Sequence, residues 1–149
     1  MCLHLLMSNL PINFFNEDID FEARNTTFLK AWIKSCLQNE RQKLSELNFI
    51  FCSDAYLLGL NQTYLAHHAF TDVITFDHSI KKGQIEGDIF ISVERVGENA
   101  DTYDQTETDE LHRVMIHGVL HLCGFADKTE KDKIRMRDKE NFYLLKRHF

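Results

Sequence analysis

The sequence predicts an α+β fold, in which a small mixed β-sheet packs with helices and one central helix is buried. Apolar stripes with helical spacing alternate along the chain with short runs of aromatic and β-branched residues, as in interleaved helices and strands. The predicted strands are unevenly spaced, which favours a mixed layer over a regular doubly wound sheet. The 149 residues, 44% of them hydrophobic and only 1 a proline, suit one domain with its own core.

The first half of the chain predicts a helix, a strand and a second helix. An apolar stripe with helical spacing runs through residues 25–40 and predicts the first helix. The aromatic and β-branched run over residues 47–52 predicts a strand. Ser53 or Asp54 then caps a short helix, because either side chain accepts a hydrogen bond from a free backbone N–H. The apolar opening, residues 1–7, is interpreted as a first strand or a ragged N-terminus; it has no basic leader, so no signal peptide is expected.

The middle of the chain predicts two neighbouring strands. Residues 73–76 and 85–92 are apolar runs of strand length, and Lys81-Lys82-Gly83 between them predicts a turn. A short helix is expected over residues 93–100, and a polar, acidic stretch follows it.

The last part of the chain predicts two helices of different character. Residues 108–123 form an apolar helix with acidic residues at its start, where they suit the positive end of the helix dipole. Gly124 stands where a left-handed C-terminal cap belongs. From Thr129 onward a charged helix is expected. Its apolar contacts are expected to be Ile134, Tyr143 and Leu144.

Charge and cysteine content limit the classes of function. The net charge is −6, but residues 128–149 carry eight basic and four acidic side chains, whereas residues 1–127 carry nine and nineteen. The acidic bulk argues against loose, charge-driven binding of nucleic acid, and the basic end leaves room for a local contact. The widely spaced cysteines, with Cys36 and Cys52 in apolar patterns, indicate buried thiols in a reducing cytosol. No stretch approaches the roughly 18 apolar residues of a membrane span.

One helix carries the strongest chemical signal. His117 and His121 are four residues apart in a segment, residues 114–123, that is otherwise apolar or glycine. Both therefore project from the same face of a buried helix and need polar partners. A shared metal ion supplies one, and Asp127, three residues after the turn at Gly124, can return a carboxylate to it. Two histidines and one carboxylate, with a fourth position for water, are typical of a catalytic zinc site.

The residue after the first histidine limits the reaction. Zinc proteases with the H-E-x-x-H motif hold their general base there, whereas this chain has Gly118. Ordinary metalloprotease chemistry therefore lacks its base. A glycine inside a helix costs roughly 1 kcal/mol relative to alanine. Two explanations for it stay open: close packing of the helix on the sheet, or close approach of a substrate or a catalytic loop.

Several motifs occur in a recognisable order over residues 47–127. They are Leu60-Asn61 with Tyr64, T-D-V-I-T-F at residues 71–76, G-D-I-F-I-S at residues 87–92 and H-G-V-L-H-L-C-G-F at residues 117–125. In this order and spacing the chain resembles the YbeY family of bacterial metal-dependent endoribonucleases. The resemblance implies a zincin-like α+β fold with a metal on a central helix. It also implies cleavage of single-stranded RNA, 3′-end maturation of small-subunit (16S) ribosomal RNA, and a part in ribosome quality control.

The chain departs from the family pattern at three places. The usual third ligand is a histidine and is here Asp127, which still suits zinc but shifts the preference towards harder ions. The arginine that usually follows the tyrosine of the L-N motif is here Leu65, so a natural phosphate clamp is missing. The aspartate and proline that precede T-D-V in the family are replaced by His68 and Phe70.

Three further residues are expected beside the metal. Arg113 lies one turn before His117 on the same helix face, and we expect it to contact the scissile phosphate or to orient the attacking water. The alternative for it is an ion pair with Asp72, Asp88 or Glu110. Asp72 and Asp88 are expected to accept hydrogen bonds from the free ring nitrogens of the ligand histidines. Their alternative is helix capping or turn formation.

The remaining histidines have no ligand spacing with this pair. We expect them at the surface or in caps: His4, His67, His68, His78, His112 and His148.

The sequence thus predicts a single metal-dependent hydrolase domain over residues 1–149, with residues 1–10 either part of it or an N-terminal extension. We expect a cytoplasmic, zinc-dependent endoribonuclease that acts on RNA and the small ribosomal subunit and makes no membrane contact. Its metal ligands are His117, His121 and Asp127, and Arg113 is its candidate catalytic residue. The general base, and the choice between water and the ribose 2′-hydroxyl as attacking group, stay open.

Three alternatives also stay open. The first is a metallo-hydrolase of another bond, which the missing base at Gly118 disfavours. The second is a non-catalytic ribosome assembly factor that the metal stabilises and whose basic C-terminal helix docks on ribosomal RNA. The third is a small-ligand binding module.

Overall fold

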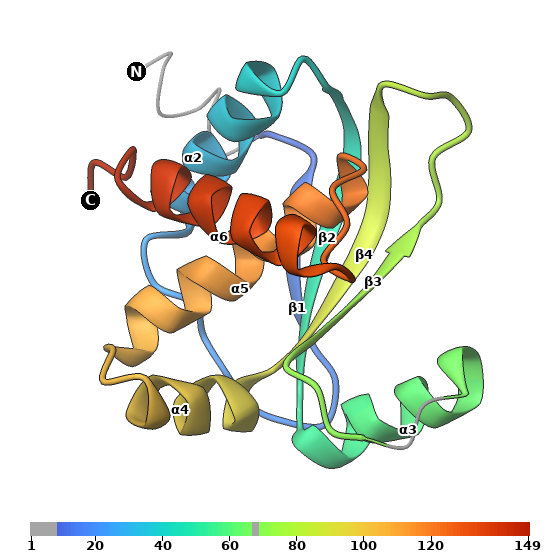
Figure 1. Ribbon diagram of the computed structural model, residues 1–149, viewed down its shortest axis with the longest axis vertical. Helices are drawn as coiled ribbons and strands as arrows, with labels where there is room; N and C mark the ends of the chain where they lie inside the picture. The colour runs from blue at the N-terminus through green and yellow to red at the C-terminus, as the bar shows by residue number, and fades with distance from the viewer. Residues whose placement is uncertain (1–8, 67–68) are drawn as a thin grey trace.

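The computed structural model describes residues 9–66 and 69–149. In chain order its elements are β1 (Ile12–Asn16), α2 (Thr26–Asn39), β2 (Lys43–Cys52), α3 (Asp54–Leu65), β3 (Val73–Asp77), β4 (Gln84–Ser92), α4 (Val93–Thr102), α5 (Glu107–Leu122) and α6 (Glu130–Leu144). Figure 1 shows these helices and strands interleaved around one sheet, which confirms the predicted mixed α+β class. Among the described helices, none has both the length and the apolar character needed to cross a bilayer.

The four strands form one mixed sheet in the order β1-β2-β4-β3. β1, β2 and β4 are parallel, and β3 runs antiparallel to β4 along one edge. The helix α2 makes the crossover between the parallel strands β1 and β2, because a parallel pair cannot be joined by a tight turn. The short connection between β3 and β4 instead forms a hairpin, with the predicted turn at Lys81-Lys82-Gly83 between the strands.

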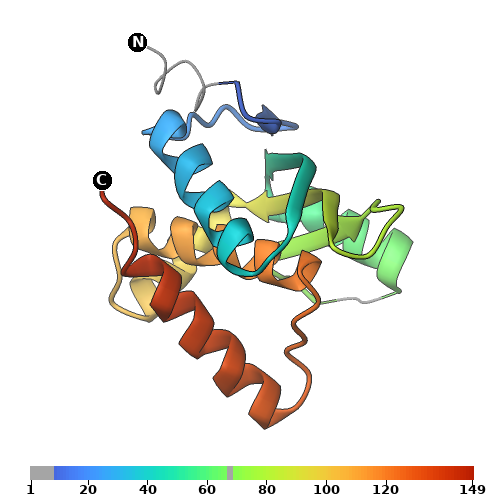
Figure 2. The same cartoon turned by 90° about the horizontal axis from the view of Figure 1, so that it is seen from above.

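The two faces of the sheet are covered by different helices. In β4, Ile85, Ile89 and Ile91 belong to the large core that α2 and α5 complete. Phe90 points to the opposite face and stacks with Tyr56 of α3, with 6.3 Å between ring centroids. This alternation follows from the two-residue period of a strand. Figure 2 shows α3 on the other side of the strands from α2 and α5.

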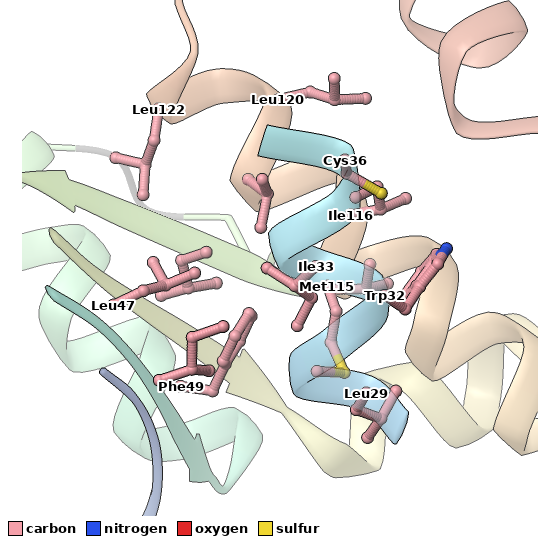
Figure 3. Packing of buried hydrophobic residues seen from close by; sticks show 14 of the residues in the cluster. Leu29, Trp32, Ile33, Cys36, Leu47, Phe49, Met115, Ile116, Leu120 and Leu122 are labelled. Atoms are coloured by element: carbon pink, nitrogen blue, oxygen red, sulfur yellow. The ribbon is translucent and has the colours of Figure 1, made fainter. Parts of the chain in front are cut away.

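The large core lies between α2, α5 and the sheet. Figure 3 shows side chains from α2, β2 and α5 meeting there, among them Leu29, Ile33, Phe49, Met115 and Ile116. Each of these five side chains is fully buried. Since burying one such side chain contributes roughly 1.5–3 kcal/mol, the core holds α5 in a fixed place from which its remaining face can carry functional groups.

Gly118 explains how closely α5 approaches the sheet. A Cβ atom at this position would lie 2.8 Å from Cγ2 of Ile89 and 3.4 Å from Cγ2 of Thr75. A real Cβ does not approach a carbon atom that closely, so any larger residue would push α5 away from β3 and β4. Of the two explanations considered for this glycine, the structure supports close helix–sheet packing.

Two strands differ from the prediction. β1 was not predicted, and the expected first strand or ragged N-terminus over residues 1–7 lies outside the described residues. β1 has one fully buried residue, Ile12, which lies opposite Leu47 of β2. β2 begins at Lys43, four residues earlier than predicted, and its first four residues are largely exposed. Neither stretch has the apolar pattern that marks a strand in a sequence.

The C-terminal helix packs through a different stripe from the one predicted. Ile134 is 63% exposed, so the contact expected from it is wrong, whereas Tyr143 is buried and Leu144 packs against the core as predicted. The buried side of α6 is formed by Met136, Glu140 and Tyr143. Thr129 begins the helix with a capping box that involves Asp132.

The described cysteines are free thiols. Cys36 and Cys52 are buried, as predicted, and Cys123 is partly buried. Burial raises the pKa of Cys52 to about 12, so its thiol stays protonated and packs as a small apolar group.

Candidate metal centre

The helix α5 and the turn that follows it bring the three predicted ligands together. The Nε2 atoms of His117 and His121 are 3.0 Å apart. The carboxylate Oδ2 of Asp127 lies 3.1 Å from Nε2 of His121 and 3.3 Å from Nε2 of His117. Three donor atoms from three side chains thus form a compact triangle, as a group that can hold one metal ion requires.

The end of α5 is shaped so that the chain reverses beside His121. Gly124 has a φ of +103°, a left-handed conformation that a glycine adopts without strain. The N–H of Gly124 donates to the carbonyl of His121 at 2.9 Å, and the N–H of Phe125 donates to that of Leu120 at 3.1 Å. These bonds end the helix and direct the following residues back, so that Asp127 faces the two histidines.

The other ring nitrogens of both histidines are held from outside the triangle. Nδ1 of His121 lies 2.9 Å from the carbonyl oxygen of Phe125, and Nδ1 of His117 lies 2.7 Å from Oε2 of Glu140. A carbonyl oxygen can only accept, so Nδ1 of His121 carries the hydrogen and its Nε2 is an open lone pair. Such outer partners fix the orientation and the tautomer of metal-binding histidines.

The donor set fits a divalent cation. Ligand atoms on a tetrahedron around zinc, with bonds of about 2.0–2.1 Å, are separated by about 3.3 Å. The three distances between the donor atoms, 3.0, 3.1 and 3.3 Å, are close to that value. Neutral imidazole lone pairs that face each other and a carboxylate repel one another, and a shared cation removes the repulsion.

Glu140 was missed in the sequence, although it binds two groups beside the centre. It comes from α6, is only 4% exposed, and accepts from Arg113 Nη1 at 2.9 Å as well as from His117. Its position on the buried stripe between Met136 and Tyr143 was the available signal. An acidic residue on the apolar side of an amphipathic helix needs a buried partner.

The pair formed by His117 and Glu140 has strongly coupled charges. Burial alone would lower the pKa of His117, but the hydrogen bond and the charge of Glu140 outweigh it and raise that pKa above its ordinary value. Burial would likewise raise the pKa of Glu140, but the hydrogen bond from His117 and the one from Arg113 keep it below its ordinary value. Glu140 is therefore an anion that favours a proton on Nδ1 of His117.

The carboxylates that were expected to hold the histidines do not do so. Asp88 instead accepts from Nδ2 of Asn48 at 3.0 Å and pairs with Nε2 of His78 at 3.0 Å. Asp72 accepts from Nδ2 of Asn99 at 3.4 Å. The prediction is wrong because the Nδ1 atoms of His117 and His121 meet α6 and the turn after α5, where neither aspartate lies.

Arg113 lies beside the centre, but with other partners than expected. Its Nη1 donates to Glu140 and its Nη2 donates to Oδ1 of Asn141 at 2.8 Å. The alternative ion pair, expected with Asp72, Asp88 or Glu110, is thus replaced by one with a residue of α6. A contact of Arg113 with a scissile phosphate stays a prediction.

The centre opens into a cleft of about 750 Å³, within the usual range for a ligand site. Its walls come from α3, β3, α4, α5 and α6. Leu65 lines the cleft and brings no charge to it. Burial raises the pKa of Asp72 and of Glu110, which lie in the same cleft. Carboxyl groups therefore line the cleft both from the segment before β3 and from α5.

The other histidines fall into three groups. The side chain of His78 is 55% exposed and His148 is exposed, as predicted. His4, His67 and His68 lie outside the described residues. His112 is only 5% exposed, so its predicted place at the surface or in a cap is wrong. It packs against Trp32 of α2 and Phe149, where a single-sequence pattern could not place it.

Comparison with known proteins agrees with the motifs. The sequence profile described as Endoribonuclease YbeY matches residues 12–148, nearly the whole chain. The chain belongs to the YbeY family. The Endoribonuclease YbeY of Cytophaga hutchinsonii is 48% identical over 143 residues, covering 96% of this chain and 100% of that protein. That of Flavobacterium psychrophilum is 51% identical over 127 residues, covering 85% and 90%.

A solved structure has the same arrangement as this YbeY family member. The solution structure of a Thermotoga maritima protein superposes with a TM-score of 0.62 at 27% sequence identity, and the match covers 89% of this chain and 86% of that one. The mixed sheet with its covering helices is thus found in an experimentally determined relative.

Proposed function

We propose that the protein is a zinc-dependent endoribonuclease, specific for single strands, that acts in ribosomal RNA processing in the cytoplasm. Its proposed substrate is the 3′ end of small-subunit (16S) ribosomal RNA, its partner is the small ribosomal subunit, and it has a part in ribosome quality control. The observation that carries the proposal is the triangle of His117, His121 and Asp127, open to a cleft, in a chain that belongs to the YbeY family. Residues 1–149 act as one zincin-like hydrolase domain.

In this proposal the chain's own residues prepare the site. A divalent ion, when bound, supplies a Lewis acid for the phosphodiester and activates the attacking group. His117 and His121 each direct Nε2 towards the ion, because Glu140 and the carbonyl of Phe125 occupy their Nδ1 atoms. Asp127 adds a negative charge, which favours harder ions than a third histidine would.

Arg113 is the proposed contact to the scissile phosphate. Its guanidinium lines the cleft and is held in place by Glu140 and Asn141. A guanidinium that is held in place suits a phosphate, because it presents a fixed positive charge and the N–H groups that Glu140 and Asn141 do not use. An Arg113→Ala variant that cleaved RNA at the wild-type rate would contradict this role. Arg113→Lys keeps the positive charge but lacks the planar, forked set of N–H donors. This variant therefore separates the effect of the charge on cleavage from the effect of the donor geometry.

The decisive test is cleavage of a single-stranded RNA by the purified protein. Cleavage is expected with zinc, and not with a chelator or in a His121→Ala variant purified in the same way. His78→Ala is a matched control, since this exposed histidine pairs with Asp88 instead of the centre. Cleavage that survives in His121→Ala would contradict the assignment. Failure of folded, zinc-loaded protein to cleave would instead favour the non-catalytic assembly factor.

The products of the same reaction identify the attacking group. A 2′,3′-cyclic phosphate would exclude direct attack by water, whereas a linear phosphate with no cyclic precursor would favour it. Peptide hydrolysis is not expected, because Gly118 offers no general base and is packed against Ile89.

A further inference from the structure

The cleft around the candidate metal centre has two chemically different walls. Among the described residues that line it, the lysine and arginine side chains are Arg113 of α5 and Lys133 and Arg137 of α6. The opposite wall is formed by β3, by Thr71 and Asp72 before it and by Leu65 of α3, and its described residues include no lysine or arginine. The helix α5 packs against both β3 and α6 and lies between the two walls.

The cationic wall presents two side chains towards solvent. Lys133 and Arg137 are four residues apart, on the face of α6 that also carries Glu140. Their side chains are 57% and 60% exposed. The Nη1 atom of Arg137 is 3.8 Å from Glu140, the carboxylate that holds His117. Lys133 meets only the highly exposed Glu130, at 3.5 Å, a contact that water screens.

These two cations differ from Arg113 in their freedom to bind a ligand. The guanidinium of Arg113 is 19% exposed and already donates to Glu140 and Asn141. Arg137 has most of its donors in solvent beside the centre. Lys133 and Arg137 therefore supply a wall that can follow a run of phosphates leading to the candidate metal centre.

The facing wall is a strand edge. β3 pairs with β4 on one side only, because it is the last strand of the sheet. At its two ends, Ser92 N donates to the carbonyl of Asp72 at 3.0 Å, and His78 N donates to that of Glu86 at 2.8 Å. Bonded and non-bonded pairs alternate along an antiparallel ladder. The odd-numbered residues of β3 consequently direct their backbone N–H and C=O groups away from β4.

Two of these odd-numbered residues, Val73 and Thr75, line the cleft. No described strand pairs with the outward backbone groups of these two residues, although the carbonyl of Val73 accepts from Oγ1 of Thr71 at 3.4 Å. Asp72, next to them, brings a carboxyl group and no cation. This wall offers a phosphate no positive charge but suits the edge of a nucleobase, which offers alternating donors and acceptors.

We propose that the cleft binds one RNA strand in a fixed orientation, with its phosphates along Lys133 and Arg137 and its bases towards the edge of β3. The inference rests on the proposed endoribonuclease function and specifies how that substrate lies. It also gives a physical origin for single-strand selectivity. In a duplex the Watson–Crick edges are already paired and cannot reach the backbone groups of Val73 and Thr75.

The phosphate wall is tested by the salt dependence of binding. We would measure the affinity for a labelled single-stranded RNA in chelator, which prevents metal-dependent cleavage, over a range of salt concentrations. Lys133→Ala and Arg137→Ala should each reduce the slope of log affinity against log salt by about 0.7, the value for one phosphate contact on a single strand. Lys131→Ala is the matched control, because it removes an exposed charge of α6 that does not line the cleft.

The base wall is tested with an abasic chain of the same length, which keeps the phosphates. It should bind more weakly than RNA but with the same salt slope. Val73→Pro removes one outward N–H without touching the pairing to β4, and should weaken RNA binding roughly two- to tenfold, as for one hydrogen bond. It should leave binding of the abasic chain unchanged, and thermal unfolding checks that it folds. If wild-type protein bound RNA and the abasic chain with equal affinity, the proposed orientation would be wrong. The outer edge of β3 would then be a site for another ligand, such as an extended peptide.

The outcomes separate this proposal from the function on which it rests. Suppose that wild-type protein cleaves RNA, but that the salt slopes of RNA binding by Lys133→Ala and Arg137→Ala equal the slope of the control Lys131→Ala. The proposed orientation is then wrong, whereas the proposed endoribonuclease function is retained. If wild-type protein neither binds nor cleaves any single strand, both fail.

Discussion

Two histidines on one helix, His112 and His117, have opposite electrostatic roles. Both are on α5, five residues apart, and both are largely enclosed by protein. His112 faces α2 and the C-terminal residues, and Nδ1 of its ring accepts from Nη1 of Arg147 at 2.8 Å. His117 faces the cleft, and its Nδ1 meets the carboxylate of Glu140.

The partner decides the charge in each case. An arginine can only donate, so Nδ1 of His112 must be unprotonated. Burial, with the nearby charge of Arg147, lowers the pKa of His112 to about 4. At His117 the charge of Glu140 overcomes the effect of burial and raises the pKa. These two enclosed histidines therefore differ in pKa because of the sign of the charge beside each, and not because of their burial.

The largest effect that tests this comparison is expected at the candidate metal centre. His121→Ala should reduce zinc affinity and RNA cleavage by more than about a hundredfold, since even the loss of an outer partner costs 10–100-fold. His112→Ala should do the reverse, with zinc affinity kept and the free energy of unfolding reduced by the cavity beside Trp32. Calorimetric titration with zinc and urea denaturation measure the two quantities. Equal loss of zinc affinity in both variants would contradict the separation.

The next effect is a pH dependence of stability that His112 causes. Its pKa is about 4 in the folded protein, below the 6.5 of the free side chain. The unfolded chain therefore binds the proton first, and stability is full above pH 6.5 and is lost as the pH falls towards 4. The expected loss is about 3 kcal/mol. Urea denaturation followed by fluorescence of Trp32, the single tryptophan, measures it, and His112→Gln should flatten this part of the profile.

Glu140→Gln tests whether the negative charge beside His117 matters for metal binding. The glutamine has no charge and cannot serve both His117 and Arg113 as acceptor through two oxygens. Zinc affinity should fall about 10–100-fold, the usual cost of losing an outer partner of a metal-binding histidine. Glu130→Gln is the control, because the side chain of Glu130 is 87% exposed at the start of α6. Unchanged zinc affinity in Glu140→Gln would show that Glu140 serves packing alone.

The smallest effect is expected from Arg147→Gln. The amide can still donate to His112, but the positive charge is gone, so the pKa of His112 should rise by a fraction of a unit. The low-pH loss of stability should then be smaller and should level off at a higher pH than in the wild type, while it still begins near pH 6.5. A loss of stability as large as that of the wild type would mean that Arg147 does not contribute to the low pKa of His112.

Local patterns predicted most of the fold. α5, β4 and the Ser53 cap of α3 were found because apolar spacing and a capping side chain act within a few residues. β1 was missed because Asn13 and Asn16 interrupt its apolar pattern. Its burial also depends on pairing with β2, whose residues lie thirty-five positions later in the sequence than their partners in β1. A strand whose partner is remote leaves little trace in its own residues.

In the candidate site, too, residues with local contacts were predicted and residues with remote contacts were missed. Asp127 was found because only a turn separates it from His121. Glu140 was missed because its contact with His117 depends on how α6 lies across α5, which no short pattern encodes. The same packing decides that Arg113 meets Glu140 instead of Asp72 or Asp88.

The origin of Glu140 in α6 has a consequence for the biosynthesis of the protein. Of the helices and strands described, α6 is translated last. A nascent chain that has reached Asp127 already carries the three candidate ligand side chains, but Glu140 cannot orient His117 until α6 has left the ribosome and docked. The surroundings of the candidate metal centre, and the part of the large core that Met136 and Tyr143 supply, are thus completed only after α6 has been made, whereas the four described strands of the sheet are all translated before it.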